Sequence, residues 1–447
     1  MDGRMLDPRI VDWIATTTGG RIERLERAIA RREAWLVDVA VGDARAPLPL
    51  FLRIAHAGDP ANSAEALEQE TRVVRALADT DVPVPRVHAV LSEPRAVLFE
   101  RVVGRSDLHT HPAEQQDAVY RHHLEVLGRL HALDVDRLGL DLRAPADARD
   151  CAMAEVDRLT TAIAGARPEP LARFGVAWLR RHAPPDVERV SLLHGDAGIA
   201  NFLFEGDRIT SLIDWEWAHL GDPMEDLGSL CVHASFSPSG DWPRLLPYYE
   251  KACGRPVDLA KVRYYRVHNL ARSVLALAPI RARLDPRDPV ALNQCFAILC
   301  DRMLCEAIAD AMGIELARPV VPEPPSETTL YDIAVDNLTQ DVLPHVQGEF
   351  PRDRLTMATL LIRTLARRHA LGPGSDAADL ETLGDVLGRR PDDLRQGQMA
   401  LERRIAEDDG RHEEAILRAL AALAYRAEAI AAPVVSLFGQ TRLRPVV

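Results

Sequence analysis

Three polar side chains in the stretch from Ser191 to Leu230 have the types and spacing that phosphoryl transfer requires. Asn201 follows Asp196 by five positions, and Asp214 ends a short apolar run. Transfer of a γ-phosphoryl group needs a carboxylate to orient the acceptor hydroxyl and hard oxygen ligands for magnesium. We therefore predict Asp196 as the catalytic base, and Asn201 and Asp214 as Mg2+ ligands. The alternatives are a helix N-cap for Asp196 and local turn contacts for the other two.

The segment around these residues has the form of a kinase catalytic loop. In protein kinases this loop reads His-Arg-Asp, four residues, Asn, and here 194–196 reads His-Gly-Asp and precedes Asn201 at the same spacing. We place His194 among the catalytic residues, where holding the loop by hydrogen bonds is favoured over moving protons. Glu216 follows the second acid closely, and its role is open between the metal and a helix anchor.

The whole stretch resembles the signature of the aminoglycoside phosphotransferase and choline kinase family. The match is especially to the branch with Asp-Trp-Glu, here 214–216, and Leu-Gly-Asp-Pro, here 220–223. The resemblance covers about residues 15 to 310. It implies binding of Mg2+ and ATP, or another nucleoside triphosphate, and phosphorylation of a small-molecule hydroxyl. The branch includes domains joined to acyl-CoA dehydrogenases, which favours a hydroxyacyl-CoA or another hydroxylated metabolite over an aminoglycoside.

The resemblance also implies a phosphate-holding cation near the N-terminus. Arg53 stands where most such kinases have a lysine, and Glu70 fits the helix carboxylate that positions this cation. The only lysines of the chain are Lys251 and Lys261, so any earlier cation must be arginine or histidine. Arginine can clasp phosphate with its planar fork, and we expect an Arg53–Glu70 pair.

The turn that covers the phosphates departs from the family pattern. Glycines are expected there, because they let the backbone approach phosphate closely, but none lies between Arg27 and Arg32. Arg31 and Arg32 are therefore candidate phosphate contacts, although exposed arginine on a turn is common. The connector between the lobes, with Glu100 and Val102, is expected to meet the adenine through its backbone.

A small mixed lobe must carry these nucleotide contacts. Alternating apolar and polar residues predict an antiparallel meander over 21–56, and 62–78 has the spacing of an amphipathic helix. The prolines in 82–85 end that helix, since each lacks an N–H and restricts its predecessor. Two further strands are expected over 86–91 and 96–102.

The remainder of the chain is predicted to be mainly helical. Helices are expected over 117–133 and 290–312, and short strands over 203–204 and 209–213. The predicted fold class is α+β, a two-lobe protein-kinase-like fold with an additional C-terminal all-α domain. The predicted parts are an N-lobe at 1–103, a C-lobe with the catalytic loop and acceptor site at 104–317, a proline-rich linker at 318–328, and a helical domain at 329–447.

The composition restricts the partners. At 447 residues the chain is too long to fold around a single hydrophobic core, so more than one domain is expected. The formal net charge of −13 argues against nucleic acid as a partner. Because no run of about 18 apolar residues exists, we expect no membrane association and a cytoplasmic location. The six cysteines show no CxxC pair and are expected to be ordinary buried thiols. The segment 329–447 is expected to serve homodimerisation or docking.

Two other functions are compatible with parts of the pattern. A nucleotide-binding pseudokinase with a scaffolding or regulatory role would account for Arg53 and the glycine-poor turn. Retention of Asp196, Asn201 and Asp214 together argues against it. A metal-dependent hydrolase could use His194, Asp196 and Asp214, but the sequence shows no additional histidine cluster of the kind that such sites favour.

Overall fold

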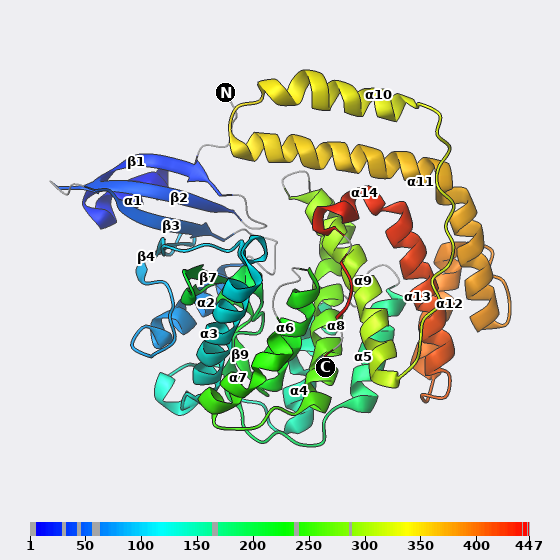
Figure 1. The fold of residues 1–447 in the computed structure, drawn as a ribbon, viewed down its shortest axis with the longest axis horizontal. Coiled ribbons are helices and arrows are strands. Elements are labelled where there is room, and N and C mark those ends of the chain that lie inside the picture. The colour runs from blue at the N-terminus through cyan, green and yellow to red at the C-terminus, as the bar shows by residue number, and fades with distance from the viewer. Residues whose placement is uncertain are drawn as a thin grey trace. The chain divides into compact units, whose positions relative to one another are not determined.

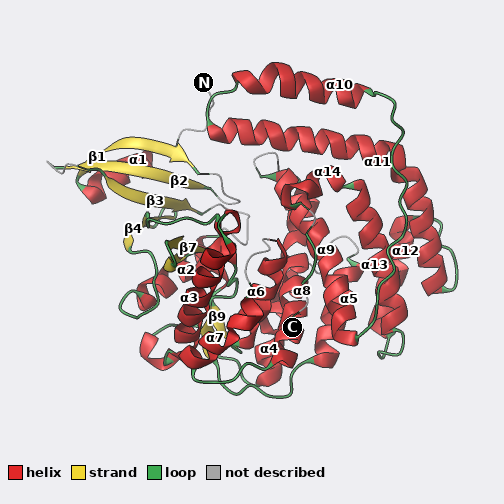
Figure 2. Cartoon of the chain, viewed as in Figure 1, coloured by secondary structure: helices red, strands yellow, loops and turns green. Residues whose placement is uncertain are grey.

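The computed structural model describes residues 6–28, 33–42, 46–55, 63–162, 169–236, 241–285, 288–439, 441–444 and 446. Figure 1 labels the helices and strands along the chain. The chain divides into two compact units, each assembled from separate stretches. The first unit comprises Met1–Ala144, Arg189–Asp226 and Pro238–Val257, and the second comprises Pro145–Glu188, Leu227–Ser237 and Asp258–Val447. Among the described residues, every named strand belongs to the first unit (Figure 2).

A five-stranded antiparallel sheet forms the N-terminal part of the first unit. Its order is β1-β2-β3-β5-β4. The strands are β1 (Gly20–Arg27), β2 (Ala34–Val41), β3 (Leu48–Ile54), β4 (Val87–Leu91) and β5 (Ala96–Glu100). The predicted meander and the two later strands are therefore confirmed. Alternate side chains of β2 and β3, such as Val37 and Leu52, are fully buried in the core that fixes the sheet register.

Two helices accompany this sheet. Helix α1 (Pro8–Thr18) begins after Asp7, whose carboxylate accepts the Arg9 N–H at 2.9 Å, and it buries Ile10 and Ile14 against the sheet. Helix α2 (Ala64–Leu77) begins after Ser63, whose hydroxyl accepts the Ala66 N–H at 3.2 Å. The amphipathic helix expected over 62–78 is thus present.

The rest of the first unit positions the predicted catalytic loop. Helix α3 (Ala113–Ala132) packs against α7 (Leu246–Cys253), and it also contacts two short two-stranded antiparallel sheets. One pairs β6 (Ser191–Leu193) with β9 (His219–Gly221), and the other pairs β7 (Phe202–Glu205) with β8 (Arg208–Leu212). Helix α6 (Met224–Phe236) follows β9.

In the described part of the second unit all regular secondary structure is helical, and most of α6 belongs to this unit. Its other helices are α4 (Ala148–Ala162), α5 (Pro170–His182), α8 (Leu259–Arg283), α9 (Val290–Met312), α10 (Leu330–Asp336), α11 (Glu349–Leu387), α12 (Leu394–Glu407), α13 (Glu413–Ile430) and α14 (Ala432–Val435). Helix α9 has the bounds that the sequence predicts. Residues 314–329, which include the proline-rich linker, form neither helix nor strand.

The C-terminal segment does not form a compact unit of its own. Glu402 of α12 accepts hydrogen bonds from the Glu169 N–H at 2.7 Å and from Arg173 Nε at 2.8 Å. Val434 of α14 is buried in one apolar cluster with Leu299 of α9. These contacts explain why 329–447, predicted as a separate domain, shares one unit with α5, α8 and α9.

The six cysteines are in the state that their spacing in the sequence predicts. All six cysteines are unbridged and buried, as the lack of paired spacing predicts. Burial raises the pKa of Cys295 and Cys300 to about 12, so these thiols stay protonated near neutrality.

No single helix of the described chain is long and apolar enough to cross a membrane. Helix α13 and the segment Ala432–Phe438 meet the length and composition criteria only when taken together, and a bend of 82° separates them.

Candidate active site

The loop between β6 and β7 brings Asp196 and Asn201 together. Asn201 Nδ2 donates to the Asp196 carbonyl oxygen at 2.8 Å and to Asp196 Oδ2 at 2.7 Å. The amide nitrogen is thereby committed to Asp196, so the amide oxygen is the atom that can meet a cation. The Ile213 N–H donates to the Asn201 carbonyl at 2.9 Å. This bond brings the end of β8, and with it Asp214, beside the loop.

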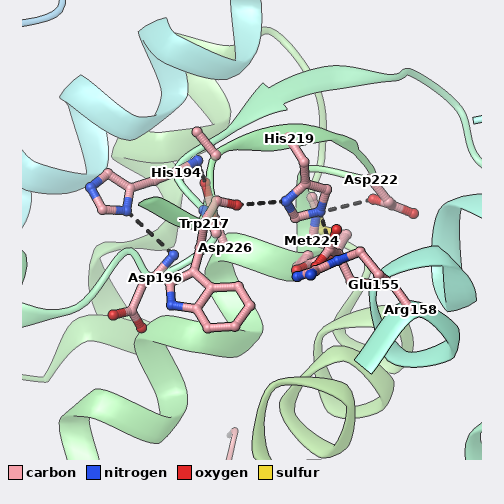
Figure 3. Close-up of polar contacts among 12 residues, drawn as sticks. Glu155, Arg158, His194, Asp196, Trp217, His219, Asp222, Met224 and Asp226 are labelled. Atoms are coloured by element: carbon pink, nitrogen blue, oxygen red, sulfur yellow. Dashed lines mark hydrogen bonds and ion pairs between the residues drawn. The ribbon is translucent and has the colours of Figure 1, made fainter. Parts of the chain in front are cut away.

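His194 connects the two segments that carry the acids. Its Nε2 donates to the Ile213 carbonyl at 2.9 Å. Its Nδ1 accepts the Asp196 N–H at 3.3 Å (Figure 3). The ring also packs on Trp215, with ring centroids 4.5 Å apart. Both ring nitrogens thus hold the backbone, which matches the loop-holding role favoured from the sequence.

The backbone is constrained at two positions of this site. Asp214 has φ 68° and ψ 58°, in the left-handed region that non-glycine residues adopt at a cost of roughly 1–3 kcal/mol. Gly195 has φ 78°, and a Cβ there would lie 2.2 Å from the Trp217 carbonyl oxygen. Only glycine therefore allows the catalytic loop to approach the 215–217 turn so closely.

Arg53 lies between two carboxylates. On β3, its Nη2 is 3.7 Å from Glu70 Oε2 of α2, and its Nη1 is 3.6 Å from Asp214 Oδ1. The Arg53–Glu70 pair inferred from the sequence is present. Arg53 is only 8% exposed and Glu70 only 4%. Arg53 Nε and Glu70 Oε2 have no hydrogen-bond partner, which suits a site that receives an oxygen-rich anion and its metal.

The remaining predicted nucleotide contacts lie elsewhere or outside the description. Glu100 ends β5 opposite Leu50, three ladder positions from Arg53, and its Oε2 accepts the Arg86 N–H at 3.3 Å. Val102 follows in the connector, outside any helix or strand. Arg31 and Arg32 lie outside the described residues.

The donor set around Asn201 and Asp214 suits magnesium. The amide oxygen of Asn201 and the carboxylates of Asp196 and Asp214 are hard oxygen donors, which Mg2+ prefers. The described residues contain no group of three or more His, Cys, Asp or Glu side chains that could hold a metal ion. A site here would therefore rest on one amide, nearby carboxylates and the phosphates of the substrate.

Asp226 anchors the catalytic loop. Asp222, Glu225 and Asp226 follow Gly221 at the start of α6, where carboxylates typically satisfy the free N–H groups of a helix N-terminus. Asp222 does so, accepting the Met224 N–H at 3.0 Å, whereas Glu225 pairs with His219 at 3.2 Å. Asp226 instead accepts two backbone N–H groups of the catalytic loop.

The charge of Asp226 is stabilised inside the protein. Full burial acts to raise its pKa, but the hydrogen bond and the charge of His131, together with His194, hold the pKa below its usual value. Asp226 therefore stays ionised and keeps accepting from the loop. No local pattern in the sequence points to His131, because its contact with Asp226 spans 95 positions.

His123 supports the same loop from α3. Its Nε2 donates to the Ala197 carbonyl at 3.3 Å, and its ring lies 4.5 Å from that of Phe202. Burial lowers the pKa of His123 to about 4, so the ring is neutral near pH 7. Sequence reasoning missed this residue as well.

A five-stranded sheet with a buried Arg–Glu pair, followed by a loop that joins an aspartate, an asparagine and a second aspartate, defines a kinase-like phosphotransferase. Residues 30–265, more than half of the chain, match the phosphotransferase enzyme family. The chain belongs to this family.

Curated relatives are longer proteins. The chain is 27% identical to "Probable acyl-CoA dehydrogenase IBR3" of Arabidopsis thaliana, covering 55% of this chain and 34% of the relative. It is 29% identical to acyl-CoA dehydrogenase family member 10 of Mus musculus, covering 42% of this chain and 19% of the relative. The chain thus spans about a third or less of the length of these relatives.

Solved structures share the fold. A candidate aminoglycoside phosphotransferase from Ralstonia eutropha has a TM-score of 0.53 at 22% identity and covers 70% of this chain and 100% of its own. Choline kinase LicA from Streptococcus pneumoniae has a TM-score of 0.50 at 16% identity, covering 68% and 98%. The kinase-like fold class predicted from the sequence is therefore confirmed.

Proposed function

We propose that this chain transfers the γ-phosphoryl group of ATP, with Mg2+, to a hydroxyl of a small molecule. The observation that carries this proposal is the hydrogen-bonded Asp196–Asn201 loop, joined through Ile213 to Asp214 and facing the buried Arg53–Glu70 pair. Each part corresponds to a requirement of phosphoryl transfer: a base, metal ligands and a phosphate-holding cation.

The geometry of the site suggests a separate role for each of these residues. Asp196 would orient the acceptor hydroxyl and accept its proton, because its Oδ2 is already held by Asn201. Asn201 and Asp214 would hold Mg2+, which neutralises phosphate charge when bound. Arg53, oriented by Glu70, would donate to the phosphates from its fork. Catalysis would come mainly from positioning and charge neutralisation.

The acceptor class that we favour is a hydroxyacyl-CoA or another hydroxylated metabolite. The relatives above carry acyl-CoA dehydrogenase names, and a kinase segment within such proteins would act on related acyl compounds. We also propose action in the cytoplasm and a role of 329–447 in homodimerisation or docking.

A screen identifies the acceptor. The purified chain is incubated with MgATP and a panel of hydroxyacyl-CoA thioesters, hydroxylated metabolites and aminoglycosides, and products are detected by mass. We expect a gain of one phosphoryl group on a hydroxylated member, with Asp196→Asn as the control that loses it. If no member of the panel yields more product with the wild type than with Asp196→Asn, the proposal fails.

A further inference from the structure

A buried series of hydrogen bonds leads from α7 through α3 to the catalytic loop. The Tyr249 hydroxyl lies 2.8 Å from His131 Nδ1, and His131 Nε2 lies 3.0 Å from Asp226 Oδ2. Asp226 Oδ2 accepts the His194 N–H at 2.8 Å, and its Oδ1 accepts the Gly195 N–H at 2.7 Å. Tyr249, His131 and Asp226 are each fully buried.

The direction of these bonds follows from their chemistry. An ionised carboxylate only accepts, so His131 Nε2 must carry the hydrogen that points at Asp226. The other ring nitrogen, Nδ1, is bonded to the Tyr249 hydroxyl at 2.8 Å, so both edges of the ring are held. The His131 backbone is held too, because its carbonyl accepts the Ser191 hydroxyl at 2.8 Å.

We propose that Tyr249 and His131 are positioning residues for the reaction, acting through Asp226. Both oxygens of Asp226 bind consecutive amides of the loop, and the next residue is Asp196. A rotation of the Asp226 carboxylate would therefore displace Asp196. His131 fixes that rotation, and Tyr249 fixes the orientation of the His131 ring. The inference rests on the proposed role of Asp196 as the base.

Two substitutions of His131 separate positioning from general stability. In His131→Gln the side-chain amide nitrogen reaches about as far as Nε2 and can still donate to Asp226, whereas in His131→Asn it stops near Nδ1. We expect His131→Asn to lower kcat by about 10- to 100-fold with KM for ATP within twofold, because a misplacement of about 1 Å can cost that much. His131→Gln should recover most of the rate.

Hydrogen exchange tests the anchoring without any substrate. In the full chain, we expect His131→Asn to speed exchange at least tenfold in a peptide that contains the His194 and Gly195 amides, and Tyr249→Phe to do so more weakly. The matched control is Tyr264→Phe, which removes another buried hydroxyl, one that donates to the Leu179 carbonyl at 3.3 Å. It should leave this peptide and kcat unchanged.

The outcomes divide cleanly. Unchanged exchange in both His131→Asn and Tyr249→Phe would overturn the anchoring, whatever the substrate. Faster exchange with unchanged kcat would overturn the positioning role while the anchoring stands. Equal kcat in the Gln and Asn variants would also overturn it, because only the first keeps the donor. If His131→Asn does not fold, Tyr249→Phe, which retains the ring packing on His131, decides by the same two readouts.

Discussion

Replacing Arg53 by lysine keeps the charge but removes the fork. The guanidinium reaches Glu70 with one nitrogen and Asp214 with the other, at 3.7 and 3.6 Å, and a single ammonium nitrogen cannot occupy both positions. Hydrogen bonds to charged groups are worth about 1.5–3 kcal/mol each. Losing one phosphate contact in this buried site should therefore reduce kcat/KM for ATP by about 10- to 100-fold.

The assay is initial-rate kinetics at saturating acceptor, combined with calorimetric binding of MgATP. Arg95→Lys is the matched control, because Arg95 forms an ion pair with Glu68 of α2 at 3.1 Å on the exposed side. Its kcat/KM should stay within about twofold, as expected for a surface pair. In a double-mutant cycle, Arg53→Lys with Glu70→Ala should lose less than the sum of the single losses.

Wild-type kcat/KM for ATP in both Arg53→Lys and Glu70→Ala would refute this reasoning. Strict additivity in the cycle would show instead that the two residues act independently. In either case, the phosphates would have to be held by other groups.

The other predictions concern the two acids and a buried histidine. Asp196→Asn should keep MgATP affinity within a few-fold while kcat falls by about 100-fold or more; unchanged turnover would remove Asp196 from the chemistry. Asp214→Ala should weaken nucleotide binding only when magnesium is present, and equal affinity with and without magnesium in wild type and variant would contradict the metal assignment. The pKa of His123 is lowered to about 4, so folding favours the neutral ring. The free energy of unfolding is therefore highest above pH 6.5, the pKa of this side chain in the unfolded chain, and it falls as the pH drops from 6.5 toward 4. Denaturant unfolding should show a loss of roughly 3 kcal/mol across that window that His123→Phe lacks; parallel pH profiles would exclude the effect.

Local patterns were sufficient for much of the fold. The repeat of apolar residues predicts helix 290–312 with its observed bounds, and strand alternation predicts the sheet that carries Arg53. The spacing from Asp196 to Asn201 predicts their proximity because five residues can close one loop. Helix α1 was missed, although Asp7-Pro8 is an N-cap followed by proline at the first helical position.

Contacts between distant positions could not be predicted in this way. Asp226 meets His194 and Gly195 across 32 and 31 positions, and only the path of the chain through β9 and α6 decides that pairing. The left-handed backbone conformation of Asp214 could not be predicted from the sequence either, because an aspartate residue does not require that conformation. Helix α11 continues through Pro373, a residue that local rules would place at a helix end.

The first unit is assembled from three separate stretches of the chain, which limits how fragments of the protein can be expressed. Any continuous fragment that contains both Arg53 and Tyr249 must also contain 145–188, which belongs to the second unit. During synthesis, the catalytic loop leaves the ribosome before the tyrosine that ends its buried anchor. The site therefore cannot be completed until the chain has grown through α7, and truncated expression clones that end earlier would contain the signature motif without its full support.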